Sequence, residues 1–372
     1  MLRVLRSQLV PQTHVHGLYF VAATTNGSHQ STGCRRFSNG QSFVNKNTHG
    51  SWKNSPQRNP KKTISEKFNK LVLTSLKRWP FLKNYYEQML KGFNRQVSDF
   101  KTGRSVSKKR KLQPNYKTTY QEHKAVFDVK GSLLKTSFLL PLFLLPMGIV
   151  IVFIPVALFP QHLLPHCYWS KKQRKIFFTD MHMNRKIHHG IVLHHLNFIK
   201  DNHPSAAFQR ALTDLLTLVN DSTKVPTNDD LRKFREWCSS IENPLSLDGL
   251  PPVLLHSFCH INFLWKYFPS PWLRYYLHHR VKLILEFDEK LRRENLVYDL
   301  SDDELQEATF LRGLDSANLS TEANRYWLKN WLRHTSIFAS NAVDPSYILH
   351  AMVFQSHNYS DLRHQRRVFD QT

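Results

Sequence analysis

An uncharged apolar run at residues 137–159 constrains this chain more than any other feature. It reads SFLLPLFLLPMGIVIVFIPVALF and contains no ionisable side chain. At about 1.5 Å per residue, a helix of this length covers the ~30 Å hydrocarbon core of a bilayer. Three prolines in the run would break a soluble helix but are tolerated in a membrane. We therefore predict a single transmembrane helix over residues 137–159. A buried helix of a soluble domain is the alternative.

The chain before this run begins with a long acid-free leader. Residues 1–65 contain no Asp or Glu, whereas Arg, Lys, Ser, Asn and Gln are frequent. This composition is typical of a mitochondrial transit peptide. The motif Arg35-Arg36-Phe37-Ser38 resembles a matrix processing site, so we predict a transit peptide at residues 1–37 and a disordered linker at 38–65. A basic tail of a nuclear or cytosolic protein is the alternative.

Positive charge dominates the whole chain. It has 52 Lys and Arg against 28 Asp and Glu, a formal net charge of +24, which favours binding to nucleic acid, ribosomes or anionic lipid. Residues 66–136 form a basic amphipathic helical segment by their spacing, and Lys108 to Lys111 are read as a juxtamembrane patch. The segment is expected either to lie on an anionic bilayer or to pack against the rest of the protein.

Helical patterns fill the chain after Pro165. Boundary signals include a capping box at Ser301 and Glu304, an N-cap at Ser270, and a helix-ending Gly313. We predict an all-α domain over residues 166–372. Its expected helices cover residues 171–199, 206–219, 229–241, 250–267, 271–295, 302–312 and 321–334.

Catalytic and metal-binding patterns are weak. The four cysteines are scattered, and the sequence has no Gly-rich phosphate loop or nucleophile elbow. The histidines at positions 182, 188, 189, 194 and 195 lack helical metal spacing and are read as a polar helix surface. His256, Cys259 and His260 have better spacing, but core packing is favoured. We expect no catalytic residue, metal or cofactor, and no enzymatic activity.

The most specific pattern lies between Pro271 and Leu332. It comprises Leu273-Arg274, Leu277, Arg280, Asp288, Leu291, Glu294, Leu300-Ser301, Glu304-Leu305, Ala308, Arg312-Gly313-Leu314, Leu319-Ser320 and Trp331-Leu332. With the exit of the apolar run at residues 154–165, it resembles the LETM family, the leucine-zipper/EF-hand transmembrane proteins of the mitochondrial inner membrane. The similarity is greatest to short members that carry the LETM domain without EF-hands, and it covers roughly residues 105–335.

The resemblance implies a single-pass inner-membrane protein whose C-terminal domain lies in the matrix. In the family this domain is 14-3-3-like and ribosome-binding. Here it would end in a SAP-like helix-turn-helix unit, with Leu305, Leu314, Leu319, Trp327 and Trp331 as its expected core. Longer members are tied to potassium/proton or calcium/proton exchange. This chain lacks a carboxylate in its apolar run and an EF-hand loop, and it has Asn318 where the family usually has Gly. Ribosome binding is therefore preferred, and a part in cation exchange is the alternative.

The ribosome-binding prediction names a set of cations. These are Arg274, Arg280, Lys282, Arg292, Arg293, Arg312, Arg325, Lys329 and Arg333, which would contact phosphates of ribosomal RNA or a ribosomal protein. A merely solvated helical face is the competing interpretation. The expected function is support of membrane-protein biogenesis and mitochondrial structure. Inner-membrane lipid and a second copy of the chain are the other expected partners.

Overall fold

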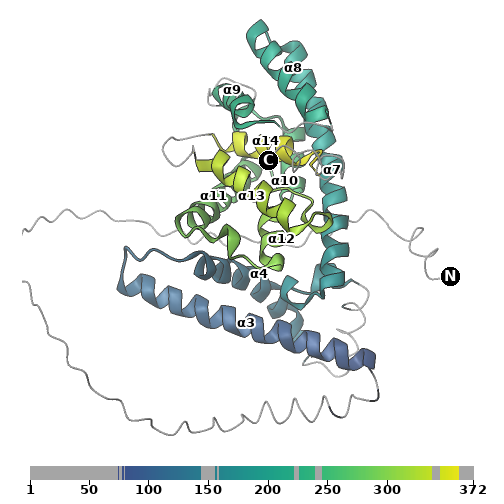
Figure 1. Ribbon diagram of the computed structural model, residues 1–372, viewed down its shortest axis with the longest axis vertical. Helices are drawn as coiled ribbons and strands as arrows, with labels where there is room; N and C mark the ends of the chain where they lie inside the picture. The colour runs from purple at the N-terminus through teal and green to yellow at the C-terminus, as the bar shows by residue number, and fades with distance from the viewer. Residues whose placement is uncertain are drawn as a thin grey trace, which may run out of the picture. The chain divides into compact units, whose positions relative to one another are not determined.

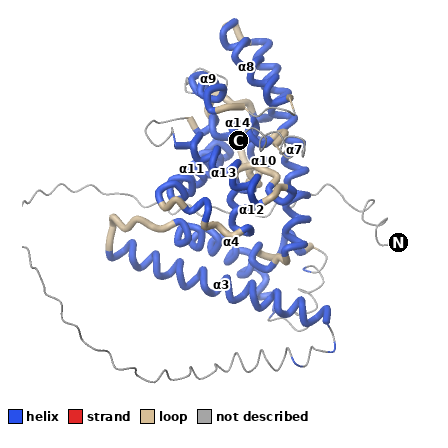
Figure 2. The backbone as a smooth tube through the Cα atoms, viewed as in Figure 1, coloured by secondary structure: helices blue, strands red, loops and turns tan. Residues whose placement is uncertain are grey.

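A computed structural model of the chain describes residues 74, 78, 80–143, 156, 159–221, 226–238, 245–336 and 344–359 (Figure 1). These residues form helices, turns and loops and contain no strand (Figure 2), so the all-α prediction is confirmed for them. Contacts divide the chain into two units, residues 21–87 and the remainder. The described residues of the unit at 21–87 include the first two turns of helix α3 (Pro80–Leu112).

The predicted transit peptide (1–37), the linker (38–65) and most of the predicted transmembrane helix (137–159) lie outside the described residues. Within the described part, helix α4 (Tyr120–Phe143) includes the first residues of the predicted transmembrane run. None of the helices that the structure describes combines the length and apolarity needed to cross a bilayer.

Helices α3 and α4 fall within and just beyond the predicted basic helical segment. A Gln96 Nε2–Thr136 Oγ1 hydrogen bond of 2.8 Å joins the two helices. The loop between them is fastened by Lys109, whose Nζ lies 2.9 Å from Glu122 Oε1. The backbone N–H of Tyr120 donates to the carboxylate of Glu294 at 3.1 Å. This last contact ties the start of α4 to the end of helix α11.

The helices after Pro165 match the predicted series with shifted ends. They are α7 (Lys171–Asn202), α8 (Ala206–Asn220), α9 (Asn228–Cys238), α10 (Pro252–Ile261), α11 (Ser270–Arg293), α12 (Asp302–Leu311) and α13 (Thr321–Ser336). The short helix α6 (Pro160–Leu163) and the 3-10 turn η2 (His166–Tyr168) precede α7. The 3-10 turns η3 (Leu296–Tyr298) and η4 (Ser316–Asn318) lie between α11 and α12 and between α12 and α13. Helix α10 ends six residues earlier than predicted, because Phe263 adopts a left-handed backbone with φ of 55°.

Capping signals explain most of these boundaries. Ser301 and Glu304 form the predicted capping box at the start of α12. Gly313 has the expected positive φ, 108°, directly after α12. The prediction that Ser270 caps α11 is wrong. Pro269 occupies the N-cap position, and Ser270 is the first residue of the helix, without a capping hydrogen bond.

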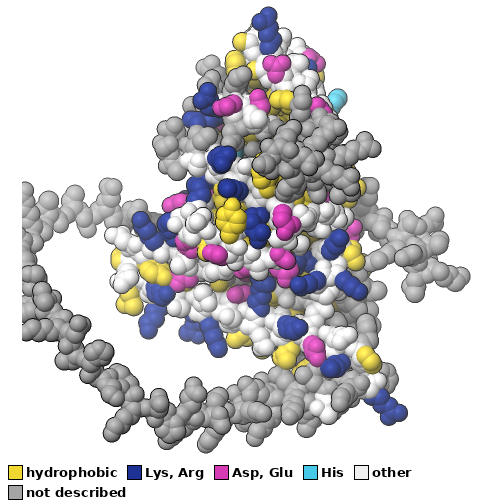
Figure 3. Space-filling model, in the orientation of Figure 1, with side chains coloured by type: hydrophobic (Ala, Val, Ile, Leu, Met, Phe, Trp, Pro, Cys, Tyr) yellow, Lys and Arg dark blue, Asp and Glu magenta, His cyan; other side chains and the backbone are white. Residues whose placement is uncertain are grey.

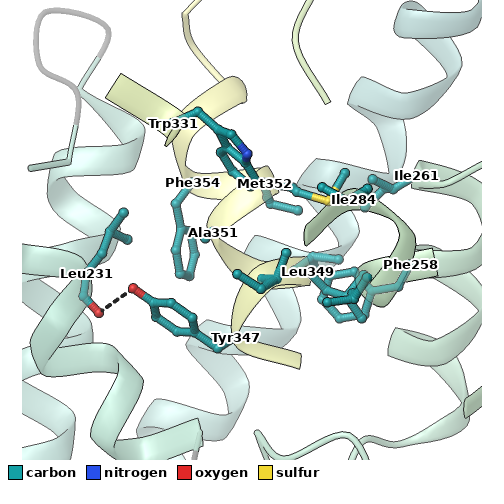
Figure 4. Close-up of a cluster of buried hydrophobic side chains, with 14 of the residues drawn as sticks. Leu231, Phe258, Ile261, Ile284, Trp331, Tyr347, Leu349, Ala351, Met352 and Phe354 are labelled. Atoms are coloured by element: carbon teal, nitrogen blue, oxygen red, sulfur yellow. Dashed lines mark hydrogen bonds between the residues drawn. The ribbon is translucent and has the colours of Figure 1, made fainter. Parts of the chain in front are cut away.

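A central helix, α14 (Pro345–Ser356), was not among the predicted elements. Every side chain from Ser346 to Ser356 is buried, and Figure 4 shows the helix surrounded by residues from several other helices. Among them, Leu231 of α9 accepts a 3.1 Å hydrogen bond from the Tyr347 hydroxyl. All five predicted core residues, Leu305, Leu314, Leu319, Trp327 and Trp331, are buried in the same cluster. Helices α9, α11 and α13 therefore pack against α14 in the main core, and a second, smaller cluster of buried side chains includes Phe178 and Phe310.

Candidate functional site

A buried ion pair joins α11, α12 and α13. Arg312, which follows the last turn of α12, places Nε 2.7 Å from Asp288 Oδ1. The indole Nε1 of Trp331 donates to the other carboxylate oxygen at 2.8 Å. Arg312 is only 1% exposed and also donates to the Ala308 carbonyl. Its guanidinium is committed to the core, which corrects the prediction that this residue contacts a ribosome.

Most other predicted ribosome-contacting cations make contacts within the fold. Arg280 is buried on α11, with 9% of its surface exposed. Arg274 donates to the carbonyls of Leu247 and Leu250, both at 3.1 Å. Arg292 donates to Thr335 Oγ1 at 3.0 Å, and Arg293 donates to the Thr118 carbonyl at 2.8 Å. These side chains fasten α11 to its neighbours, and Lys282 remains as an exposed cation midway along the helix.

The remaining cations form a row on α13. Arg325, Lys329 and Arg333 are spaced four residues apart, so they share one face of the helix. Arg325 Nε donates to the Val297 carbonyl at 3.4 Å, while Lys329 Nζ lies 3.3 Å from the hydroxyl of Tyr298. Tyr298 itself is 60% exposed. We call Arg325, Lys329, Arg333 and Tyr298 the α13 basic row. Its contact with a ribosome stays a prediction.

Charge is not segregated on the face seen in Figure 3. Lys and Arg side chains there alternate with Asp and Glu side chains. Helix α3 is the most one-sided element, with nine Lys and Arg against two acidic residues. Its last turns carry Lys108, Lys109, Arg110 and Lys111, all exposed. A polyanionic partner would therefore meet a basic helix and the α13 basic row, rather than a uniformly basic face.

A second charged centre lies where α3, α4, α7 and α12 meet, and the sequence analysis missed it. Glu307 Oε2 lies 2.7 Å from Lys124 Nζ, and Glu307 Oε1 lies 2.9 Å from Arg174 Nη1. Burial alone would raise the pKa of Glu307, but Lys124, Arg174 and Arg95 together lower it to about 2. Burial and the charge of Glu307 raise the pKa of nearby Asp128. One sequence signal could have revealed this centre. Lys124 and Asp128 follow Tyr120 at four-residue spacing, which places charged side chains on the face of α4 that packs against the core.

The histidines predicted to form a polar surface divide into two groups. His194 is exposed and His188 and His195 are half-buried, whereas His182 and His189 are buried, which corrects that interpretation for the last two. They face inward because they share a helical face with Val192 and Leu196 of α7. Cys259 and His260 are buried as expected, whereas His256 is exposed. Within the described ranges, no group of three or more ligand side chains is placed to hold a metal.

Comparison with known proteins adds a family to this geometry. Residues 118–354, well over half of the chain, match the family model described as "LETM1-like, RBD". The chain belongs to the LETM1-like family. It is 30% identical over 197 residues to "LETM1 domain-containing protein 1" of Bos taurus, which is 53% of each chain. Its identity to the Homo sapiens protein of that name is 28% over 201 residues, 54% of each chain.

A frog relative matches over a longer stretch. The protein of the same name from Xenopus tropicalis is 24% identical over 286 residues, which is 76% of this chain and 80% of the relative. The chain spans about half the length of the cattle and human relatives it matches. The LETM1-like segment contains the Asp288–Arg312 pair, the Glu307 centre and the α13 basic row, whereas α3 precedes it.

Proposed function

We propose that this protein is anchored in the mitochondrial inner membrane and that its C-terminal helical domain binds the mitochondrial ribosome in the matrix. There it would support membrane-protein biogenesis and mitochondrial structure. The LETM1-like match over residues 118–354 carries the proposal, because the LETM resemblance implies a domain of this kind. The acid-free leader at 1–65 supports mitochondrial import, and the uncharged run at 137–159 supports anchoring.

The distribution of charge supports a nucleic-acid-rich partner. A net charge of +24 attracts polyanions over long distances. The α13 basic row offers cations at regular spacing for phosphates and an exposed aromatic ring at Tyr298 for stacking on an unpaired base. Cations that neutralise phosphates release bound counterions, so binding of this type weakens steeply with salt.

Co-sedimentation with purified mitochondrial ribosomes tests this function. The protein should sediment with ribosomes at low salt, and the association should weaken as salt rises. Lys329→Glu with Arg333→Glu removes two exposed charges of the row. Log affinity decreases with log salt, and the magnitude of this slope should become smaller by about 1 for each phosphate contact that is lost. Lys186→Glu with Arg210→Glu, exposed positions on α7 and α8, is the matched control and should bind as the wild type does. Failure of the wild-type protein to sediment even at low salt would rule the proposal out.

Protease protection tests the membrane placement. A C-terminal epitope should resist protease in intact mitochondria and in mitoplasts, and it should be digested only after the inner membrane is dissolved. The protein should also remain in the membrane pellet after alkaline extraction. Digestion of the epitope in intact mitochondria would contradict the proposed orientation.

A further inference from the structure

A cavity of about 130 Å³ lies beside the Glu307 centre, bounded by α3, α4, α7, α11, α12 and the loop that carries Pro165. Much of its wall is aromatic. The rings that line it belong to Tyr120, Phe127, Phe178, Phe263, Phe287 and Phe310. Its volume is close to that of the ~150 Å³ cavity known to hold a benzene molecule. The cavity therefore has room for an apolar group of that size.

Arg185 projects into this cavity from the middle of α7. The side chain is 1% exposed, and its Nε donates to the Ile261 carbonyl at 2.9 Å while Nη1 donates to the Phe310 carbonyl at 3.1 Å. The guanidinium lies 4.6 Å from the ring centres of both Phe263 and Phe310. In the part of the chain that the structure describes, no carboxylate oxygen lies within 4.0 Å of it. A buried arginine is thus held by carbonyls and rings, and the carboxylate of Asp315 acts on it only from beyond ion-pair distance.

The cavity as a whole carries excess positive charge. Six basic side chains line it, Arg95, Lys124, Lys135, Arg185, Arg280 and Arg312, against the three acidic side chains Asp99, Asp128 and Glu307. Arg312 is neutralised by Asp288, and Lys124 is paired with Glu307. Lys135 Nζ has the Leu164 carbonyl as its hydrogen-bond acceptor at 3.5 Å. Burial and the charge of Arg280 lower the pKa of Arg185 to about 9 even though the charge of Asp315 acts to raise it, so on balance its surroundings disfavour the cation. A bound anion would relieve that unfavourable field.

We propose that this cavity binds a small organic acid, a carboxylate carried on an apolar group of roughly benzene size. The carboxylate would pair with Arg185, and the apolar group would lie among Phe178, Phe263 and Phe310. A planar guanidinium held by its neighbours is suited to a carboxylate, because both groups present two parallel hydrogen-bonding positions. The same chemistry is found in a free organic acid and in the acid end of a short fatty acid. Because residues of α3 line the cavity together with residues of α4, α11 and α12, the ligand would stabilise the packing of the basic helix α3 on the LETM1-like domain.

The test uses the purified full chain in a mild detergent and four small molecules as probes. Hexanoate has the charge and the apolar group, hexanamide keeps the shape without the charge, and inorganic phosphate has charge without an apolar group. Benzoate is an acid whose apolar group is a ring, whereas hexanoate resembles a short fatty acid. Comparing their binding distinguishes the two sources of the carboxylate. Hexanoate or benzoate should raise the melting temperature to a plateau and bind in calorimetry with one site. Hexanamide and phosphate should bind at least about tenfold more weakly, as expected for loss of a charged hydrogen bond or of apolar burial.

Two variants locate the site. Arg185→Met should weaken hexanoate binding at least about tenfold. Because this change also removes two buried hydrogen bonds of the core, Ser132→Phe provides an independent test. Ser132 lines the cavity from α4, its hydroxyl bonds only within its own helix, and a phenyl ring there would fill the space while leaving Arg185 in place. Ser107→Phe, an exposed position on α3, is the matched control and should bind as the wild type does.

Several results would overturn the proposal. These are the absence of saturable binding by either acid, equal binding of hexanoate and hexanamide, and binding of phosphate as tight as that of hexanoate. Unchanged hexanoate binding in Ser132→Phe would place the acid elsewhere and would also overturn it. These measurements contain no ribosome, so their failure is separate from any failure of the proposed function.

Discussion

The carboxylate of Asp288 organises the junction of α11, α12 and α13. It accepts hydrogen bonds from Arg312 through one oxygen and from Trp331 through the other. Burying two charges costs desolvation free energy, and their mutual attraction offsets that cost only when both partners are present. The turn at Gly313 brings the arginine into place, and its backbone lies close to Met352 of α14, so a side chain there would meet both an unfavourable φ and a neighbouring helix.

Removing one partner of this pair should destabilise the fold strongly. Asp288→Asn or Arg312→Met is expected to lower the free energy of unfolding by about 3–5 kcal/mol, because each leaves a buried charge without its counter-ion. The double variant should lose less than the sum of the two single losses, since no buried charge is left unpaired. Denaturant unfolding of all four proteins measures this. Strict additivity of the two losses would contradict the ion-pair account.

Individual arginines show where sequence reasoning was limited. Arg280 follows Leu273 and Leu277 at helical spacing, so its place on the buried face of α11 was readable from the sequence. Arg185 lies in the same way on the buried face of α7, between Phe178 and Val192. The position of Arg312 was not readable, because it depends on how the Gly313 turn directs the chain toward α11. Charge alone does not tell whether a cation is at the surface.

Helix α14 shows the corresponding limit at the scale of an element. Its sequence from Tyr347 to Phe354 is apolar except for His350, so it has no amphipathic period to detect. Helices α7 to α13 each carry a polar face or a capping signal, and each was predicted. A helix that is apolar all round belongs in the centre of a bundle, which is where α14 lies (Figure 4). The other helices supply the surfaces that cover it.

Truncating a side chain of α14 should therefore be costly. Met352 is fully buried, and Met352→Ala should lower the free energy of unfolding by about 2–5 kcal/mol through lost burial and the cavity left behind. Met183 on α7 is 59% exposed and gives a matched control, because Met183→Ala removes the same atoms at the surface. The control should change stability by less than about 0.5 kcal/mol. Similar losses in the two variants would contradict the central position of α14.

At the scale of the whole molecule, buried histidines link stability to pH. Burial lowers the pKa of His182 to about 3 and the pKa values of His334 and His350 to about 4. In the unfolded chain each titrates near about 6.5. The unfolded state therefore binds these protons first as pH falls, and the folded state loses stability below pH ~6.5.

Between pH 7 and 5 the free energy of unfolding should fall, with a slope approaching about 1.4 kcal/mol per pH unit for each buried histidine. Asp99, Asp128 and Asp315 act in the opposite direction, because their raised pKa values make the folded state take up protons as pH falls. They are outnumbered by the histidines with lowered pKa values, since burial also lowers the pKa of His123, His166 and His189. The lowered pKa of Glu307 also makes the folded state lose stability on acidification, but only at a pH below this range. Denaturant unfolding at a series of pH values measures this trend. A flat or rising profile from pH 7 to pH 5 would contradict it.

The family and the order of helices were predictable from sequence because their signals are local. Capping residues and the Gly313 turn each act over a few residues, and the pattern from Pro271 to Leu332 is made of short motifs that can each be recognised by themselves. The Glu307 centre was not predictable, because it assembles Lys124, Arg174 and Glu307 from three distant helices. The cavity beside it depends on the same assembly. Long-range packing, rather than local propensity, creates both.

Site-specific photo-crosslinking tests the ribosome-binding account most directly. A photoreactive phenylalanine analogue at position 298 would lie in the α13 basic row, and the same group at exposed Tyr267 would lie beyond the other end of α11. That 24-residue helix separates the two positions by about 36 Å. In isolated mitochondria, position 298 should give crosslinks to ribosomal RNA or ribosomal protein that decrease as salt is raised, and position 267 should give few. Equal crosslinking from both positions, or none from position 298, would contradict the account.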